Sequence, residues 1–416
     1  MKFFLKTFGC KLNQYESQLI RENLISCGFQ ETDSIYDSQY VIVASCAVTQ
    51  DSVKGMRKFI SSARVKNPEI KIIVTGCWVN VYPYQVRKMQ PYLALNNTQK
   101  YYLPAYLGKK DFKFKNQISG FKSHHRAFVK IQDGCDNRCS YCCIWMARGK
   151  SHSRKPGEIL DEIKNLVEAG YKEIVLTGLC LGDYGKDVNY SIVKLLEEIE
   201  KLNYRFRMRL SSIEPQDITE ELIEFLRRSE KFVPHLHIPL QSGSDRILKL
   251  MNRKYDCDYF ANLVSKLKSH NKKFQFSTDI MVGFPGEEEG DFLNTIKILK
   301  ELSPVRVHIF PFSPRPGTPA FNFKNQVNSR IIWERKKKLQ EEVNEIVKNN
   351  LESQIGKILQ VLFERKKDKW WVGYSENYIK CFAQENRKSL DGKICDVKIT
   401  GIDYDKLACY VQILST

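Results

Sequence analysis

The chain has 416 residues, 42% of them hydrophobic, and carries a formal net charge of +18. The length predicts two or three domains, and the hydrophobic fraction excludes a disordered chain. No apolar run reaches the roughly 18 residues of a membrane span, and the N-terminal apolar segment is too short for a signal peptide. We therefore expect a cytoplasmic protein without a membrane span.

The first hundred residues alternate strands and helices. Apolar runs at 3–8, 40–44 and 70–74 predict buried parallel strands, and helical periodicity occupies 14–27 and 51–65. This alternation predicts a small doubly wound α/β domain, which we place at residues 1–110. A polar, basic linker follows it.

A second α/β region occupies residues 121–352. Its sequence predicts six strands separated by helices, at 128–132, 173–177, 207–211, 235–240, 275–281 and 306–310. Six βα units predict a partial (βα)6 barrel with its chemistry at the carboxyl ends of the strands. A long amphipathic helix closes this region.

Residues 353–416 have the period-two pattern of strands. Five short strands are predicted, at 358–363, 370–374, 379–382, 395–399 and 408–413. Five strands in so short a segment predict a small antiparallel β-barrel. The fold class is therefore α/β with an added C-terminal barrel.

Thirteen cysteines in a cytosolic chain indicate metal binding or catalysis rather than disulfides. Cys135, Cys139 and Cys142 form a C-x3-C-x2-C motif directly after the first barrel strand. Three thiolates can hold three irons of a 4Fe–4S cluster and leave the fourth iron open, whereas a structural zinc site takes four ligands. This motif is typical of enzymes that cleave S-adenosylmethionine (SAM) to a radical.

Cys10, Cys46 and Cys77 each follow a predicted strand of the N-terminal domain. Parallel strands bring their carboxyl ends to one edge of the sheet, so these thiols can converge on a second cluster. Three buried structural thiols remain the alternative, because free cysteines are often buried. Among the other cysteines, we expect Cys180 at the barrel mouth and the rest in packing roles.

Four segments together resemble the radical SAM methylthiotransferase family over nearly the whole chain. They are residues 7–17 (TFGCKLNQYES), 235–244 (HLHIPLQSGS), 278–287 (TDIMVGFPGE) and 310–318 (FPFSPRPGT). The first is similar to the branch that acts on N6-threonylcarbamoyladenosine in tRNA. The C-terminal barrel resembles the TRAM domain, an RNA-binding module.

The resemblance implies a reaction and its cofactors. The cluster on Cys135, Cys139 and Cys142 would bind and split SAM, and a second cluster on Cys10, Cys46 and Cys77 would carry the sulfur. A methylthio group would be added to C2 of an adenosine next to the anticodon, in the anticodon stem-loop of tRNA. An external electron donor and a sulfur source are then required, and we expect a monomer.

Three alternatives stay open. The substrate could be isopentenyladenosine in tRNA or a ribosomal protein, and the chain could be a non-enzymatic zinc- and RNA-binding protein. The chain also departs from the family pattern beside the cysteines, at residues 143–145, at Cys180 and at residues 78–80. These departures affect the choice of substrate more than the reaction class.

Polar residues at the strand ends are candidates for binding SAM. We select Thr177, Gly178, Ser211, Glu214, Gln241, Ser242 and Asp279 because they are expected at the barrel mouth. For Glu214 and Asp279 the alternative is a salt bridge to a barrel arginine. Arg148 could pair with the SAM carboxylate or with a tRNA phosphate.

The C-terminal barrel combines cations with aromatic rings, which favours RNA binding. The candidate RNA-binding residues are Arg365, Lys366, Lys367, Lys369, Trp370, Trp371 and Tyr374. Trp370 and Trp371 are adjacent and must face opposite sides of a strand, so we expect at least one of them to be exposed or covered by another domain. The alternative is that the rings fill the barrel core. We also expect residues 353–416 to be removable without loss of SAM cleavage.

Overall fold

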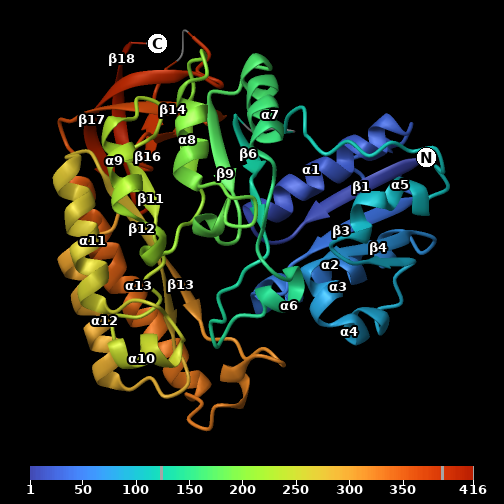
Figure 1. Cartoon of the computed structure of the whole chain (residues 1–416), viewed down its shortest axis with the longest axis horizontal. Coiled ribbons are helices and arrows are strands. Elements are labelled where there is room, and N and C mark those ends of the chain that lie inside the picture. Colours follow the sequence, from blue (N-terminus) through green and yellow to red (C-terminus); the bar gives the residue numbers. More distant parts are fainter. Residues whose placement is uncertain (122–124, 386–387, 416) are drawn as a thin grey trace.

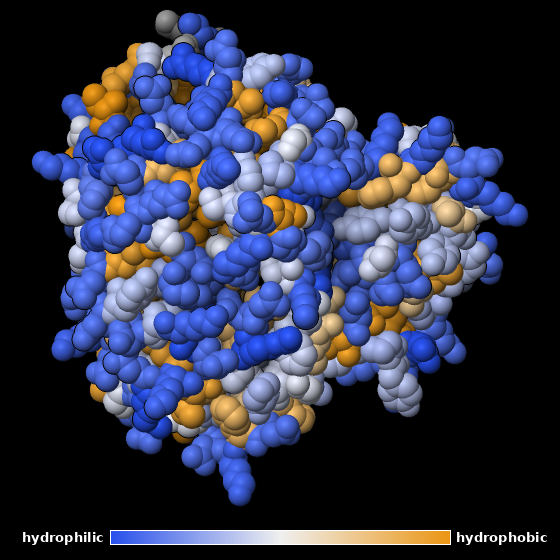
Figure 2. Space-filling model, viewed as in Figure 1, coloured by the Kyte–Doolittle hydropathy of each residue, from blue (hydrophilic) through white to orange (hydrophobic). Residues whose placement is uncertain are grey.

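The structure is a computed structural model that describes residues 1–121, 125–385 and 388–415. Three parts lie side by side: an N-terminal sheet with its helices, a central curved set of strands, and a C-terminal barrel (Figure 1). Hydrophilic side chains predominate on the face shown in Figure 2, where hydrophobic residues appear in separate patches. No helix in the described part of the chain has both the length and the apolar character needed to cross a membrane.

The N-terminal sheet is parallel throughout, with strand order β2-β1-β3-β4-β5. Its strands are β1 (Lys2–Thr7), β2 (Gln30–Glu31), β3 (Tyr40–Ser45), β4 (Lys71–Gly76) and β5 (Leu93–Leu95). The helices are α1 (Lys11–Ser26), α2 (Gln50–Lys66), α3 (Cys77–Val81), α4 (Pro83–Arg87) and α5 (Leu103–Tyr106).

Both faces of this sheet are covered. Val41 and Val43 of β3 pack toward α2, whereas Ile42 packs with Leu24 of α1 on the opposite face. Successive strand residues point to opposite faces, so continuous apolar runs are the expected pattern for a strand buried on both sides. The predicted doubly wound arrangement is confirmed.

The central part contains all six predicted strands, each at nearly its predicted position. They are β6 (Arg126–Lys130), β9 (Glu173–Thr177), β10 (Arg207–Leu210), β11 (His235–His237), β12 (Gln275–Val282) and β13 (Arg306–Pro311). They form two parallel three-stranded sheets, β6-β9-β10 and β11-β12-β13, and a bridge between Met208 and Phe232 links the two. The predicted partial barrel is confirmed, and its two sheets are joined through an isolated bridge rather than through a continuous pair of strands.

The helices pack around the outside of this partial barrel (Figure 1). They are α7 (Pro156–Glu168), α8 (Ile192–Glu200), α9 (Glu220–Arg228), α10 (Asp245–Leu250), α11 (Cys257–His270), α12 (Glu289–Leu302) and α13 (Ser329–Glu352). Thr219 illustrates how they begin, because its side chain accepts a hydrogen bond from the backbone N–H of Leu222 at the start of α9. The cysteine loop adds β7 (Gln132–Asp133), α6 (Ile144–Arg148) and β8 (His152–Ser153).

The C-terminal barrel is closed, with strand order β14-β15-β16-β18-β17. Its strands are β14 (Ile358–Lys367), β15 (Trp370–Ser375), β16 (Lys380–Ala383), β17 (Ile394–Asp403) and β18 (Ala408–Ser415). Four of the five neighbouring pairs are antiparallel, as predicted, but β16 and β18 are parallel. A closed barrel of five strands cannot alternate in direction all the way around, so one parallel pair is required.

This barrel packs against the start of the central strands. The ring of Tyr378 stacks on the ring of His235 of β11, with 4.7 Å between the ring centroids. Arg126 of β6 donates two hydrogen bonds to Glu364 of β14. The hydrophobic core also runs continuously from β14 into the central part. Removal of residues 353–416 would therefore expose this core. Persistence of SAM cleavage after that removal stays a prediction.

Candidate active site

The three N-terminal cysteines follow adjacent strands of the sheet. Cys10 precedes α1, Cys46 follows β3, and Cys77 begins α3 directly after β4. Gly9 has a φ of +113°, and a Cβ atom there would lie 2.9 Å from Cys46 Cβ. Only glycine allows this close approach, which brings the first two cysteines together. We call Cys10, Cys46 and Cys77 the N-terminal triad.

These thiols also influence one another electrostatically. The pKa of Cys10 is raised to about 11, mainly because the surrounding protein removes solvent, and Cys77 and Cys46 raise it further. Cys10 nevertheless remains exposed on one side, whereas Cys46 and Cys77 are buried.

Cys135, Cys139 and Cys142, the barrel triad, occupy the loop between β7 and α6. The N–H of Cys142 donates to the carbonyl of Cys139 at 3.1 Å, and the N–H of Ser140 donates to Met251 at the end of α10. The side chain of Arg253 donates to Cys139 Sγ at 3.3 Å. Burial raises the pKa of both Cys139 and Cys142.

The spacing of the sulfur atoms distinguishes a cluster from a single ion. In the residues described, His237, Asp279 and His308 are the one set of His, Cys, Asp or Glu whose three ligand atoms lie within 4.8 Å of one another. Two sulfurs on one zinc ion can be at most about 4.6 Å apart, twice the Zn–S bond length. Neither triad therefore holds all three of its sulfurs as a single zinc ion would.

A cavity of about 540 Å³ lies where the barrel triad meets the loop after β3. It is bordered by Cys142 of the barrel triad and by residues 48–51, which follow Cys46. Gln241 and Asp279, at strand ends of the barrel, also line it, and Trp333 and Lys336 of α13 form part of its wall. A concave site with a few polar groups is the usual form of a substrate pocket.

Two of the predicted SAM-binding residues therefore face this cavity, Gln241 and Asp279. Asp279 Oδ1 lies 3.1 Å from His237 Nε2 and 3.2 Å from His308 Nδ1. The two imidazoles lower the pKa of this carboxyl despite its burial. The predicted alternative of an arginine partner is wrong for Asp279, and the two histidines were missed because they lie on neighbouring strands.

The remaining predicted SAM-binding residues lie at strand ends. Thr177 and Ser211 have buried hydroxyls with no hydrogen-bond partner in the described residues. Gly178 packs so closely on Gln132 that a Cβ atom would lie 2.7 Å from its Oε1. Ser242 is buried, and Glu214 forms an ion pair with Arg253, the alternative that the sequence left open.

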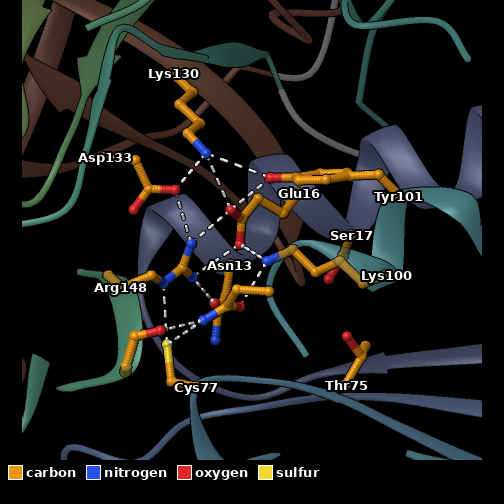
Figure 3. A network of polar contacts seen from close by, with 12 residues as sticks. Asn13, Glu16, Ser17, Thr75, Cys77, Lys100, Tyr101, Lys130, Asp133 and Arg148 are labelled. Atoms are coloured by element: carbon orange, nitrogen blue, oxygen red, sulfur yellow. Dashed lines mark hydrogen bonds and ion pairs between the residues drawn. The ribbon is translucent and has the colours of Figure 1, made fainter. Parts of the chain in front are cut away.

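Arg148 does not line the cavity. Its side chain is 1% exposed, and it pairs with Glu16 of α1 and with Asp133 of β7. The expected pairing with a SAM carboxylate or a tRNA phosphate is corrected, because protein carboxylates already occupy the guanidinium (Figure 3). Glu16 was missed because its partner lies 132 residues away.

The other cysteines separate into two groups. A hydrogen bond with Cys180 lowers the pKa of Cys135, which places Cys180 beside the barrel triad. Cys143 points instead toward the N-terminal part, with its Sγ 3.5 Å from the carbonyl oxygen of Ala47. Three are buried in the C-terminal barrel and two are half-buried elsewhere: Cys381, Cys395, Cys409, Cys27 and Cys257.

The predicted RNA-binding residues are divided between surface and interior. The four cations are exposed around the β14–β15 turn: Arg365, Lys366, Lys367 and Lys369. Trp371 is buried and donates to the carbonyl of Glu385, so its expected stacking on RNA is corrected. Trp370 is half-buried against Tyr410, and Tyr374 stacks on Tyr378.

Comparisons with known proteins match this architecture. The radical SAM superfamily model matches residues 129–299, and the model described as uncharacterized protein family UPF0004 matches residues 2–96. Threonylcarbamoyladenosine tRNA methylthiotransferase MtaB of Thermotoga maritima is 39% identical over 395 residues, 90% of each chain. The tRNA-2-methylthio-N(6)-dimethylallyladenosine synthase of Hydrogenobaculum sp. is 33% identical over 435 residues, 99% of each chain.

The chain belongs to the radical SAM methylthiotransferase family. Enzymes of this family use SAM and carry two 4Fe–4S clusters, so the predicted reaction class and cofactors are confirmed. Among solved structures, the radical SAM methyltransferase TsrM of Kitasatospora setae has a TM-score of 0.59 at 12% identity and covers 77% of each chain. That likeness shows the fold alone.

Proposed function

We propose that this methylthiotransferase adds a methylthio group to C2 of N6-threonylcarbamoyladenosine, next to the anticodon of tRNA. The observation that carries the proposal is the cavity lined by Cys142 of the barrel triad and by residues 48–51, which follow Cys46 of the N-terminal triad. In this arrangement the barrel triad holds the cluster that cleaves SAM, and the N-terminal triad holds the cluster that carries sulfur. The protein's own contribution is to position both around one adenosine and to exclude water.

Two lysines support the threonylcarbamoyl substrate over the dimethylallyl one. Lys54 of α2 and Lys336 of α13 both line the cavity, and neither ammonium has an ion-pair partner among the residues described. The threonylcarbamoyl group ends in a carboxylate, whereas a dimethylallyl group is uncharged and apolar. In adenine, C2 and C6 are the two carbons bonded to N1, and the N6 group is attached to C6. If C2 faces the clusters, the N6 group therefore lies to one side of them, along the cavity wall.

Replacing Lys54 and Lys336 together by alanine is expected to lower kcat/KM for a threonylcarbamoyladenosine stem-loop about tenfold, or ~1.4 kcal/mol. Asp51 and Asp279 also line the cavity, so removal of both lysines leaves the lining with an excess of negative charge. Kinetics with a stem-loop that carries unmodified adenosine provide the control. An equal decrease in kcat/KM on both RNAs would mean that the lysines do not bind the N6 group.

The C-terminal barrel and its exposed cations are proposed to hold the tRNA. Replacing Arg365, Lys366, Lys367 and Lys369 by alanine should weaken tRNA binding tenfold or more and flatten its salt dependence, by about 0.7–0.9 in the log–log slope for each phosphate that is no longer neutralised. The matched control replaces the four exposed lysines Lys109, Lys110, Lys113 and Lys115, which changes the net charge equally. Equal reductions in binding by the two variants would indicate a general charge effect.

The reaction also needs an external electron donor and a sulfur source, and we propose a cytoplasmic monomer. Isopentenyladenosine in tRNA and a ribosomal protein are the other candidate substrates. Mass spectrometry of tRNA nucleosides from cells that lack the protein tests the choice. Loss of the methylthio derivative of N6-threonylcarbamoyladenosine is expected, and loss of the isopentenyl derivative instead would contradict it.

A further inference from the structure

Arg148 connects the two triads. It ends α6, six residues after Cys142 of the barrel triad, and its Nε lies 3.2 Å from the Sγ of Cys77 in the N-terminal triad. In Figure 3 its guanidinium points from the barrel loop toward Cys77 and the start of α1. One side chain therefore contacts a sulfur of one predicted cluster from the loop that holds the other.

Every N–H of this guanidinium is used. Nη1 donates to Glu16 at 2.6 Å and to Asp133 at 3.1 Å, and Nη2 donates to Glu16 at 2.8 Å and to Asn13 at 2.9 Å. An arginine has five N–H donors, so the Nε–H that remains is directed at Cys77 alone. The four other hydrogen bonds fix its direction.

The charges around Arg148 do not balance without the sulfur. Three buried cations, Arg148, Lys100 and Lys130, surround two carboxylates, Glu16 and Asp133. Burial lowers the pKa of Lys100 to about 8, so it is still mainly protonated at neutral pH. Buried charges are normally paired, and a cysteine that ligates a cluster does so as a thiolate, so a cluster ligand at Cys77 would supply the missing negative charge.

We propose that Arg148 is a positioning residue that orients Cys77 and raises the reduction potential of the cluster on the N-terminal triad. Hydrogen bonds to cluster sulfurs and nearby positive charge both raise the potential of an iron–sulfur centre. The proposal rests on the proposed function, because it takes the N-terminal triad to be a cluster site. It adds the group that sets the electronic properties of that site.

The test uses the full chain with Cys135, Cys139 and Cys142 replaced by alanine, so that the N-terminal cluster is observed alone. Arg148→Gln and Arg148→Lys are introduced into this parent, and the midpoint potential is measured by an EPR-monitored redox titration. Arg148→Gln is expected to shift the potential to a more negative value, and Arg148→Lys, which keeps the charge, to shift it less.

Arg154→Lys is the matched control. Arg154 is a half-buried arginine that pairs with a buried carboxylate, Glu162, and no contact with a cysteine is found for it among the described residues. The Arg154→Lys variant should lower the melting temperature without changing the midpoint potential of the N-terminal cluster. If Arg148→Gln has the potential of the parent, the proposal is wrong.

Two further outcomes are informative. If Arg148→Gln binds no cluster while its apoprotein melts at the temperature of the Arg154→Lys apoprotein, the role in positioning Cys77 for the cluster is supported. If its cluster is lost only together with the fold, Arg148 is a structural residue and the proposal fails. A parent protein that binds no iron would instead contradict the proposed function, and the two failures are thus distinguishable.

Discussion

Replacing Cys46 by alanine is expected to remove about half of the iron and all methylthiolated product, while SAM is still cleaved to 5′-deoxyadenosine. Cys46 follows β3 in the N-terminal part, whereas the barrel triad lies on a separate loop after β7. Loss of one cluster should therefore leave the other in place. Iron analysis, nucleoside mass spectrometry and a 5′-deoxyadenosine assay measure the three quantities.

Cys27 provides a matched control for this variant. It lies in the same part of the fold, at the opposite end of α1 from Cys10, about 24 Å away for a helix of 16 residues. Cys27→Ala should retain both iron and product. An iron content for Cys46→Ala equal to that of the unaltered protein would show that the N-terminal triad is structural.

Replacing Cys139 by alanine is expected to abolish 5′-deoxyadenosine formation altogether. This triad would hold the cluster that supplies the electron for SAM cleavage, and its Cys142 lines the cavity. The measurement is single-turnover SAM cleavage with an excess of reductant. Cys257→Ala, a half-buried cysteine at the start of α11, should cleave SAM normally.

The variant Cys180→Ala tests whether three or four thiolates hold the cluster at the barrel triad. Cys180 lies beside Cys135, and its sulfur accepts a hydrogen bond from Asn137 at 3.4 Å. If three thiolates hold the cluster and leave an iron for SAM, Cys180→Ala keeps its iron. Loss of iron equal to that of Cys139→Ala would mean a closed site without a position for SAM.

The sequence was most informative where a short pattern determines local structure. Strands that are buried on both faces, such as β3 (YVIVAS) and β9 (EIVLT), appear in the sequence as nearly continuous apolar runs. The rule that parallel strands end at one edge placed Cys10, Cys46 and Cys77 near each other, and the structure brings them together. A cysteine motif within eight residues likewise needed no tertiary information.

Contacts between distant segments could not be predicted in this way. Arg148 pairs with Glu16, which lies 132 residues away in the chain. Tyr378 stacks on His235, and these two residues are 143 positions apart. Single-sequence periodicity shows which face of an element is buried but not which element covers it. The role of Arg148, the burial of Trp371 and the shared core of the C-terminal barrel were missed for this reason.

The most direct test of the proposed function uses the reconstituted protein under anaerobic conditions with SAM, reductant and a sulfide source. Two anticodon stem-loops are compared, one carrying N6-threonylcarbamoyladenosine and the other isopentenyladenosine, and the nucleosides are analysed by mass spectrometry. A methylthio product is expected on the threonylcarbamoyl RNA alone. A product on the isopentenyl RNA with the threonylcarbamoyl RNA unchanged, or no product on either while SAM is cleaved, would contradict the account.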